Sequence, residues 1–160
     1  MSYPEPKYFG ETGEIDAHFR PAGHPTELFF NNGSADYLAT GASTGGQFGL
    51  YQWNMSGNRS GPDPHFHKSI SESFYILSGA MRLFNGEQWI DAEPGDFLYV
   101  PEGGIHGFRN ESGEPASMLL LFAPGAPREG YFEGLATLGE LSEAERKAFF
   151  EYHDTYWIDD

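Results

Sequence analysis

The 160-residue chain contains no cysteine. Disulfides, redox-active thiols and thiolate-bound structural zinc are therefore excluded. Basic residues are also scarce, since 9 lysines and arginines stand against 24 acidic residues, for a formal net charge of −15. Such a surface repels phosphate backbones and anionic lipid headgroups, so we expect no binding to nucleic acid or to a membrane. A neutral, hydrophobic or weakly acidic small molecule is a better-matched ligand.

Long hydrophobic runs are absent as well. No segment approaches the roughly 20 consecutive apolar residues that cross a bilayer as a helix. Residues 1–19 have neither a basic start nor an apolar core, so we expect no secretory signal. The expected location of the protein is therefore the cytoplasm.

Glycine and proline interrupt the chain at short intervals, with 21 glycines and 11 prolines. Between them lie eight or more short segments rich in aromatic and branched residues, which indicate strands. Short strands at regular spacing are typical of an all-β fold, either an antiparallel β-barrel or a double-sheet jelly roll. The strands are expected within 26–40 (two strands around an Asn-Asn-Gly turn), 47–55, 65–77, 80–84, 87–91, 96–101, 105–110 and 116–123.

Two of these segments carry predictions about burial. The apolar run ASMLLLFA at 116–123 is consistent with a strand buried on both faces. In 47–55 either the bulky side chains or the amides between them face inward, and alternation alone does not decide. The residues concerned are Tyr51, Trp53 and Met55 on one face and Gln52 and Asn54 on the other.

The C-terminal segment has the signature of a helix. Ser142 is a good N-cap residue, and Glu145 three positions later completes a capping box. We therefore expect a helix over 143–153, with Phe149, Phe150 and Tyr152 on an apolar face that packs on the outside of the barrel. The predicted division of the chain is an N-terminal arm (1–25), a β-barrel (26–124) and a C-terminal helical extension (125–160).

Four potential metal ligands, His65, His67, Glu72 and His106, lie in two segments that read GPDPHFHKSISESFYILSG and GDFLYVPEGGIHGFRN. Residues two apart in a strand share a face, so His65 and His67 point the same way. A single histidine on an apolar strand is usually a hydrogen-bonded core residue. Three imidazoles and a carboxylate between regularly spaced glycines and prolines instead indicate a metal site. Such a set holds one divalent transition metal and leaves coordination positions open, which is typical of a catalytic site.

Three further histidines and Arg109 are expected to have structural roles. His18, His24 and His153 lie outside both segments and are expected at surface or capping positions. Arg109 points away from the face of its neighbour Phe108, so it is expected to form an ion pair on the outer face. The predicted substrate pocket is apolar and consists of Phe74, Ile76, Phe97, Tyr99, Phe108 and Trp53.

The two segments resemble the paired motifs of the cupin superfamily, specifically small single-domain cupins. The second motif agrees at every position from Gly95 to Asn110, and the first agrees from His65 to Gly79. The first motif departs at its start, where only three residues follow Gly61 before the histidine. The resemblance implies a double-stranded β-helix, a metal site on the four ligands, and a homodimer formed through an outer sheet face.

A fainter resemblance concerns LATGASTGGQFGLYQWNM at 38–55, which is similar to quercetin dioxygenase-like cupins and to cupins that act on aromatic polyketides. It implies a metal-dependent dioxygenase that uses O2 on an aromatic or enolisable substrate. Iron, nickel, manganese, cobalt or zinc fits the ligands. We expect Glu72 to act as a catalytic general base, because an apolar pocket can raise the proton affinity of a carboxylate. The alternatives are a non-redox cyclase or isomerase and a small-molecule-binding protein without turnover.

Overall fold

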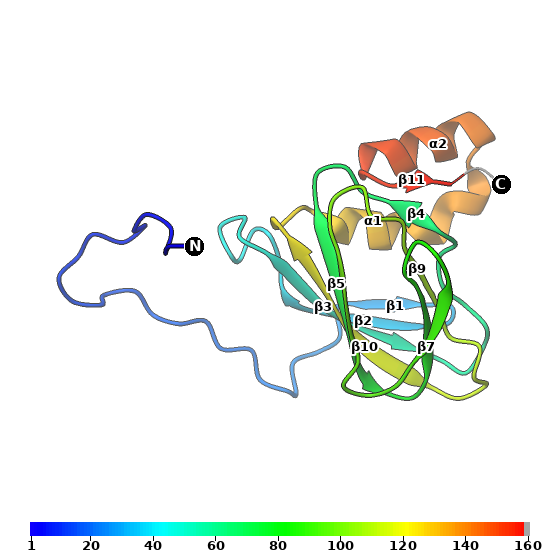
Figure 1. Ribbon diagram of the computed structural model, residues 1–160, viewed down its shortest axis with the longest axis horizontal. Coiled ribbons are helices and arrows are strands. Elements are labelled where there is room, and N and C mark those ends of the chain that lie inside the picture. The colour runs from blue at the N-terminus through cyan, green and yellow to red at the C-terminus, as the bar shows by residue number, and fades with distance from the viewer. Residues whose placement is uncertain (159–160) are drawn as a thin grey trace.

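Short antiparallel strands build the body of the protein. A computed structural model describes residues 1–158, and its strands form three sheets (Figure 1). The largest sheet has the strand order β1-β2-β3-β10-β5-β8, and the smaller sheets have the orders β7-β6-β9 and β11-β4. The strands are β1 (Leu28–Phe30), β2 (Gly33–Ala39), β3 (Gly49–Met55), β4 (His65–Phe66), β5 (Ser71–Ser78), β6 (Met81–Phe84), β7 (Trp89–Ala92), β8 (Phe97–Val100), β9 (Gly107–Arg109), β10 (Ala116–Ala123) and β11 (Tyr156–Trp157).

The all-β prediction is confirmed, and each segment expected to be extended contains at least one strand. Segment 65–77 divides into β4 and β5, because a turn interrupts it before Ser71. The tight connection from β5 to β6 requires Gly79, whose φ is +75°. A Cβ at this position would lie 2.5 Å from the carbonyl oxygen of Pro115, so a larger residue would push this turn away from the start of β10.

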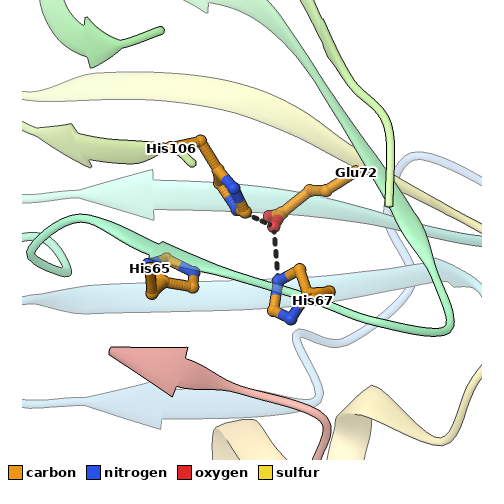
Figure 2. Close-up of side chains that lie close together, drawn as sticks. All are labelled: His65, His67, Glu72 and His106. Atoms are coloured by element: carbon orange, nitrogen blue, oxygen red, sulfur yellow. Dashed lines mark hydrogen bonds and ion pairs between the residues drawn. The ribbon is translucent and has the colours of Figure 1, made fainter. Parts of the chain in front are cut away.

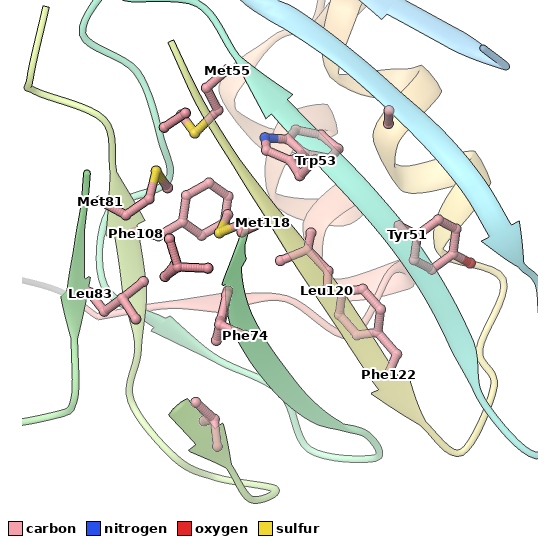
Figure 3. Packing of buried hydrophobic residues seen from close by; sticks show 14 of the residues in the cluster. Tyr51, Trp53, Met55, Phe74, Met81, Leu83, Phe108, Met118, Leu120 and Phe122 are labelled. Atoms are coloured by element: carbon pink, nitrogen blue, oxygen red, sulfur yellow. The ribbon is translucent and has the colours of Figure 1, made fainter. Parts of the chain in front are cut away.

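The six-stranded and three-stranded sheets face each other across an apolar core (Figure 3). The ring of Phe108 in β9 lies 5.8 Å from that of Phe74 in β5 and 6.5 Å from that of Trp53 in β3. These contacts join the two sheets into the barrel-like jelly roll that the sequence predicts. Tyr51, Trp53 and Met55 are buried, so the bulky face of β3 is the inward one.

Strand β10 lies between β3 and β5, yet only one of its faces is buried. Met118, Leu120 and Phe122 point into the core, whereas Leu121 on the opposite face is 36% exposed. The prediction that 116–123 is buried on both faces is therefore wrong. Hydrogen bonding on both edges fixes the strand, and burial of a second face is not needed for that.

The C-terminal extension contains more structure than the predicted helix. It comprises α1 (Arg128–Gly134), the 3₁₀ helix η1 (Leu135–Glu140), α2 (Glu143–Tyr152) and β11. The helix over 143–153 is confirmed as α2, and both hydrogen bonds of the Ser142–Glu145 capping box are present. Phe149 and Phe150 pack against the core, but Tyr152 is 85% exposed, so its assignment to the apolar face is wrong. The rings of Tyr131 and Phe149 stack with centroids 5.8 Å apart, which holds α1 against α2 at one end of the barrel (Figure 1). The missed helix α1 is short, and no side chain caps its start.

Residues 1–25 contain no helix or strand, and they extend away from the barrel (Figure 1). The division of the chain at residues 25 and 124 stays a prediction. None of the helices within residues 1–158 combines the length and apolar character that crossing a bilayer requires.

Candidate metal centre

The four predicted ligands converge from three segments of the chain, at β4, at β5 and just before β9 (Figure 2). His65 opens β4, Glu72 lies in β5 and His106 immediately precedes β9. One ligand atom from each of these three and one from His67 all lie within 4.8 Å of one another, and none of the four residues is more than 5% exposed. A buried cluster of this composition offers the donor set that divalent transition metals prefer.

Backbone hydrogen bonds fix the positions of these residues. His65 and His106 form an isolated antiparallel bridge, in which each backbone N–H donates to the carbonyl of the other at 2.9 Å. The N–H of Gly103 donates to the carbonyl of His67 at 2.7 Å, and Gly103 has a φ of +80° that favours glycine. The Pro-Glu-Gly-Gly turn before His106 is therefore tied directly to the backbone of His67.

In each imidazole, Nδ1 lies within hydrogen-bond distance of a backbone carbonyl oxygen. A carbonyl only accepts hydrogen bonds, so Nδ1 carries a hydrogen in each ring and Nε2 is the nitrogen that a metal can bind. The ring and carbonyl pairs are His65 with Asp63 (2.8 Å), His67 with Asp154 (2.6 Å) and His106 with Gly104 (2.9 Å).

Glu72 lies between two of these rings (Figure 2). Its Oε2 is 2.8 Å from Nε2 of His106 and 3.1 Å from Nε2 of His67. Burial alone would raise the pKa of this carboxyl, but hydrogen bonds and charge from the two rings outweigh burial and lower the pKa below its ordinary value. The expectation of a raised proton affinity is therefore wrong, because the apolar surroundings are not the only influence on Glu72.

The imidazoles differ in their affinity for protons. Burial, followed by the nearby ring of His106, lowers the pKa of His65 to about 3, so this ring is neutral at physiological pH. Burial also opposes a charge on His106, but the hydrogen bond and negative charge of Glu72 outweigh it and raise the pKa of that ring. A proton shared by Glu72 and His106 therefore competes with a metal ion for this cluster.

Asp154, in the C-terminal extension, completes the support of His67. It has a φ of +53°, in the left-handed region that few residues other than glycine adopt. Its carbonyl accepts the hydrogen bond from His67, while its carboxylate accepts from the backbone N–H groups of Lys68 at 3.0 Å and Ser69 at 2.9 Å. Sequence reasoning missed Asp154, because no local pattern indicates a contact between positions 87 apart.

A cavity of about 570 Å³ opens beside the cluster, and His65 and Glu72 form part of its wall. Trp53 and Phe108, both expected in the substrate pocket, lie in this wall. Mostly apolar surroundings with a few polar groups are typical of sites for small organic ligands. Further apolar residues of the wall are Met55, Leu120, Phe122, Tyr131, Phe132 and Phe150.

The other predicted pocket residues lie elsewhere. Phe74 and Ile76 are buried in the core, with 1% and 0% exposure, and they are not part of the cavity wall. Phe97 and Tyr99 are 64% and 57% exposed on the outer face of β8, so their assignment to the pocket is wrong. Alternation along β8 turns Val100 inward and these two rings outward.

Sequence reasoning also missed the part of the wall that the C-terminal extension supplies. Arg128, Tyr131 and Phe132 of α1 and Trp157 of β11 all line the cavity. The ring of Trp157 lies 5.1 Å from that of His65, because β11 pairs with β4. The aromatic composition of REGYFEG was the available signal, but its place in the fold depends on long-range packing.

The other histidines and Arg109 lie outside the cluster of predicted ligands. His18 and His24 are exposed, and His153 is the C-cap residue of α2. Arg109 donates from Nη2 to the carboxylate of Asp63 at 2.7 Å, which is the ion pair expected on the outer face.

Comparison with known proteins agrees with this fold and site. Residues 52–122 match the family model described as a cupin domain. This match covers less than half of the chain, and together with the motif residues and the fold it supports a small protein of the cupin superfamily. A stretch of 61 residues, 38% of the chain, is 38% identical to quercetin 2,3-dioxygenase of Bacillus subtilis (strain 168). A stretch of 61 residues is also 31% identical to an uncharacterized protein of Aquifex aeolicus (strain VF5). These matches span 18% and 50% of the two relatives.

Solved structures share the fold at lower identity. KdgF from Halomonas sp. is 18% identical with a TM-score of 0.58, over 69% of this chain and 96% of that one. The polyketide cyclase RemF from Streptomyces resistomycificus is 21% identical with a TM-score of 0.57, over 71% of this chain and 82% of that one. At these identities the likeness extends to the fold alone.

Proposed function

We propose that the protein is a metal-dependent enzyme, a dioxygenase that acts on a hydrophobic aromatic or enolisable small molecule. The observation that carries the proposal is the buried cluster of His65, His67, Glu72 and His106 at the wall of an apolar cavity. The partial match to a quercetin 2,3-dioxygenase supports the same reaction class, although it spans only 18% of that protein.

The chemistry of the donor set fits an iron, nickel, manganese, cobalt or zinc ion. His65, His67 and His106 each direct Nε2 away from a carbonyl-bound Nδ1, and Glu72 adds a carboxylate oxygen. Once bound, such an ion polarises a substrate oxygen and, if redox-active, supplies electrons for reaction with O2. The reaction needs no external reductant where both oxygen atoms enter the product and the substrate itself supplies the electrons that reduce O2.

The residues of the chain position the substrate and accept its proton. The aromatic side chains of Trp53, Phe108 and Phe132 offer flat surfaces to a ring-bearing substrate and exclude water from the cavity. Glu72 is the carboxylate of the cluster, and we assign it the proton of a substrate hydroxyl or enolisable C–H.

A non-redox cyclase or isomerase is the second candidate. The same three imidazoles and one carboxylate suit zinc, which polarises a carbonyl and stabilises an enolate without electron transfer. A protein that binds such a molecule without turnover is the third candidate.

Oxygen consumption distinguishes the three candidates. The protein is loaded separately with each of the five metals and offered quercetin and a panel of phenols and β-diketones, with an oxygen electrode and product analysis. We expect one O2 consumed per substrate converted and no conversion under argon. Conversion under argon would identify the cyclase or isomerase, and an unchanged panel would identify the binding protein. Glu72→Gln should lose conversion, and Glu102→Gln, in an exposed turn, serves as its control.

We also propose that the protein is a homodimer located in the cytoplasm. Large apolar side chains on the outer face of the six-stranded sheet support the dimer, since Tyr75, Phe97 and Tyr99 are 42%, 64% and 57% exposed. Contiguous exposed apolar surface of this kind often marks a contact with another protein.

A further inference from the structure

Arg128 is a buried cation in the wall of the cavity. Within residues 1–158 it is the one lysine or arginine that is buried, with 4% exposure. It opens α1 and lines the same cavity as His65 and Glu72. A buried guanidinium is costly unless hydrogen bonds or an opposite charge compensate its loss of hydration.

That compensation is incomplete within the described part of the chain. Nη1 of Arg128 donates to the carbonyl oxygen of His153, while Nε is buried and has no hydrogen-bond partner there. No carboxylate of residues 1–158 forms an ion pair with the guanidinium. The carboxylate of Glu72 shares the cavity, but its hydrogen bonds go to His67 and His106.

The surroundings of the guanidinium suit a flat ligand with an anionic end. Its Cζ lies 4.2 Å from the ring centroid of Tyr131 and 5.2 Å from that of Phe122, so aromatic faces hold it in place. Nε1 of Trp157, on the same cavity wall, is a second buried donor without a partner among the described residues. Two unsatisfied donors beside apolar walls are complementary to an oxyanion attached to a ring system.

We propose that the cavity binds a ligand with an apolar, ring-bearing body and one anionic oxygen group, and that Arg128 pairs with that group. This proposal rests on the proposed function for the class of reaction, and it adds the charge of the substrate. The anionic group is a carboxylate, a phenolate or an enolate, which share the same acceptor chemistry. With a formal net charge of −15, the protein attracts no anions at long range. Tighter binding of an anionic than of a neutral ligand must therefore arise from the local contact with Arg128.

The test compares two probes of nearly identical shape, 2-naphthoate and the neutral 2-naphthamide, by isothermal titration calorimetry. The full chain is used after chelator treatment, so that the carboxylate cannot bind a metal instead of Arg128, and again after loading with zinc. Wild-type protein should bind 2-naphthoate at least tenfold more tightly than 2-naphthamide in both states. Because neither O2 nor turnover is involved, this result is independent of whether the dioxygenase proposal survives.

Three variants locate the source of the preference. Arg128→Gln should reduce the ratio of the two affinities to about one while 2-naphthamide binding stays within about threefold of wild type. Arg128→Lys should keep part of the preference, and Trp157→Phe, which removes the N–H but keeps a ring, should reduce it. Arg109→Gln, in the outer-face ion pair with Asp63, is the matched control and should change neither affinity.

Several results would overturn the proposal. One is that wild-type protein binds the two probes equally or binds neither. Another is that the Arg128→Gln variant still binds 2-naphthoate more tightly than 2-naphthamide. Equal loss of both probes with a lowered melting temperature in that variant, together with an unchanged preference in Trp157→Phe, would make Arg128 a structural residue. If Arg128→Gln does not fold, the proposal is tested by the ratio of the two affinities in the wild-type protein and in the Trp157→Phe variant.

Discussion

At the scale of single residues, the candidate metal centre depends on which ring nitrogen carries a hydrogen. Backbone carbonyls hold the Nδ1 hydrogens of all three imidazoles, so the Nε2 atoms converge on Glu72. His65 is neutral, whereas Glu72 raises the pKa of His106. The centre is therefore arranged for a metal, and a proton is its natural competitor.

A pH dependence of metal affinity follows from this competition. His106 keeps its proton to a higher pH than a free imidazole, so the apparent affinity for zinc should rise with pH up to the raised pKa of His106 and then level off. Below about pH 6 binding should weaken steeply. Calorimetric titrations with zinc in buffers of different ionisation enthalpy should show net proton release at pH 6.5. An affinity that is independent of pH between 5.5 and 8, without proton release, would show that the Glu72–His106 pair holds no displaceable proton.

At the scale of elements, the C-terminal extension is part of the metal centre. Strand β11 pairs with β4, which carries His65, and the carbonyl of Asp154 holds the ring of His67. Helix α1 contributes Arg128 and two aromatic rings to the cavity wall. The barrel therefore supplies the ligands, and the C-terminal extension supplies some of the contacts that hold them in position.

Asp154→Ala tests this role. Alanine fits poorly at a φ of +53° and cannot accept hydrogen bonds from the backbone of Lys68 and Ser69. Loss of this kind of supporting contact typically lowers metal affinity about 10–100-fold, and we expect a loss in that range. Asp154→Asn tolerates the left-handed region and should recover part of the affinity. Asp91→Ala, at an exposed carboxylate, is the control; equal zinc affinities for Asp154→Ala and Asp91→Ala would contradict the account.

Elements of the barrel were predictable from sequence because each strand has its own pattern. The glycine-bounded segments, the His-x-His alternation and the capping box at Ser142 are local signals, and all three correspond to observed elements. The orientation of β8 was predicted wrongly, because Phe97 and Tyr99 are as bulky as core residues and composition alone does not reveal a sheet face turned outward. The contribution of Asp154 and Arg128 was not predictable, since it depends on how a distant segment packs.

At the scale of the whole molecule, one sheet face is open and apolar. Tyr75 pairs in register with Phe97, and Ser73 pairs with Tyr99, so the exposed rings of β5 and β8 are adjacent. Leu121 of β10 lies opposite Ser73 and extends this surface. If a second copy covers the surface, as we propose, a charge placed on it should separate the subunits.

Phe97→Glu should therefore convert the protein from dimer to monomer without loss of metal binding. A buried glutamate at a symmetric contact faces its own copy, which adds repulsion to the cost of desolvation. Light scattering coupled to size-exclusion chromatography gives the mass, and metal analysis gives the occupancy. Tyr152→Glu, at an exposed position on α2, is the matched control and should remain dimeric. A wild-type protein that stays monomeric at 100 µM would refute the dimer.

Metal stoichiometry tests the central claim most directly, namely that four side chains from three segments of the chain bind one ion. Wild-type protein, His65→Ala, His106→Ala and the surface control His24→Ala are each incubated with one equivalent of zinc or nickel, desalted and analysed by mass spectrometry of the metal. We predict close to one ion per chain for wild type and His24→Ala, and less than about one tenth of an ion for the other two, because the remaining ligands hold the ion weakly against water. Full occupancy in both His65→Ala and His106→Ala would contradict the account.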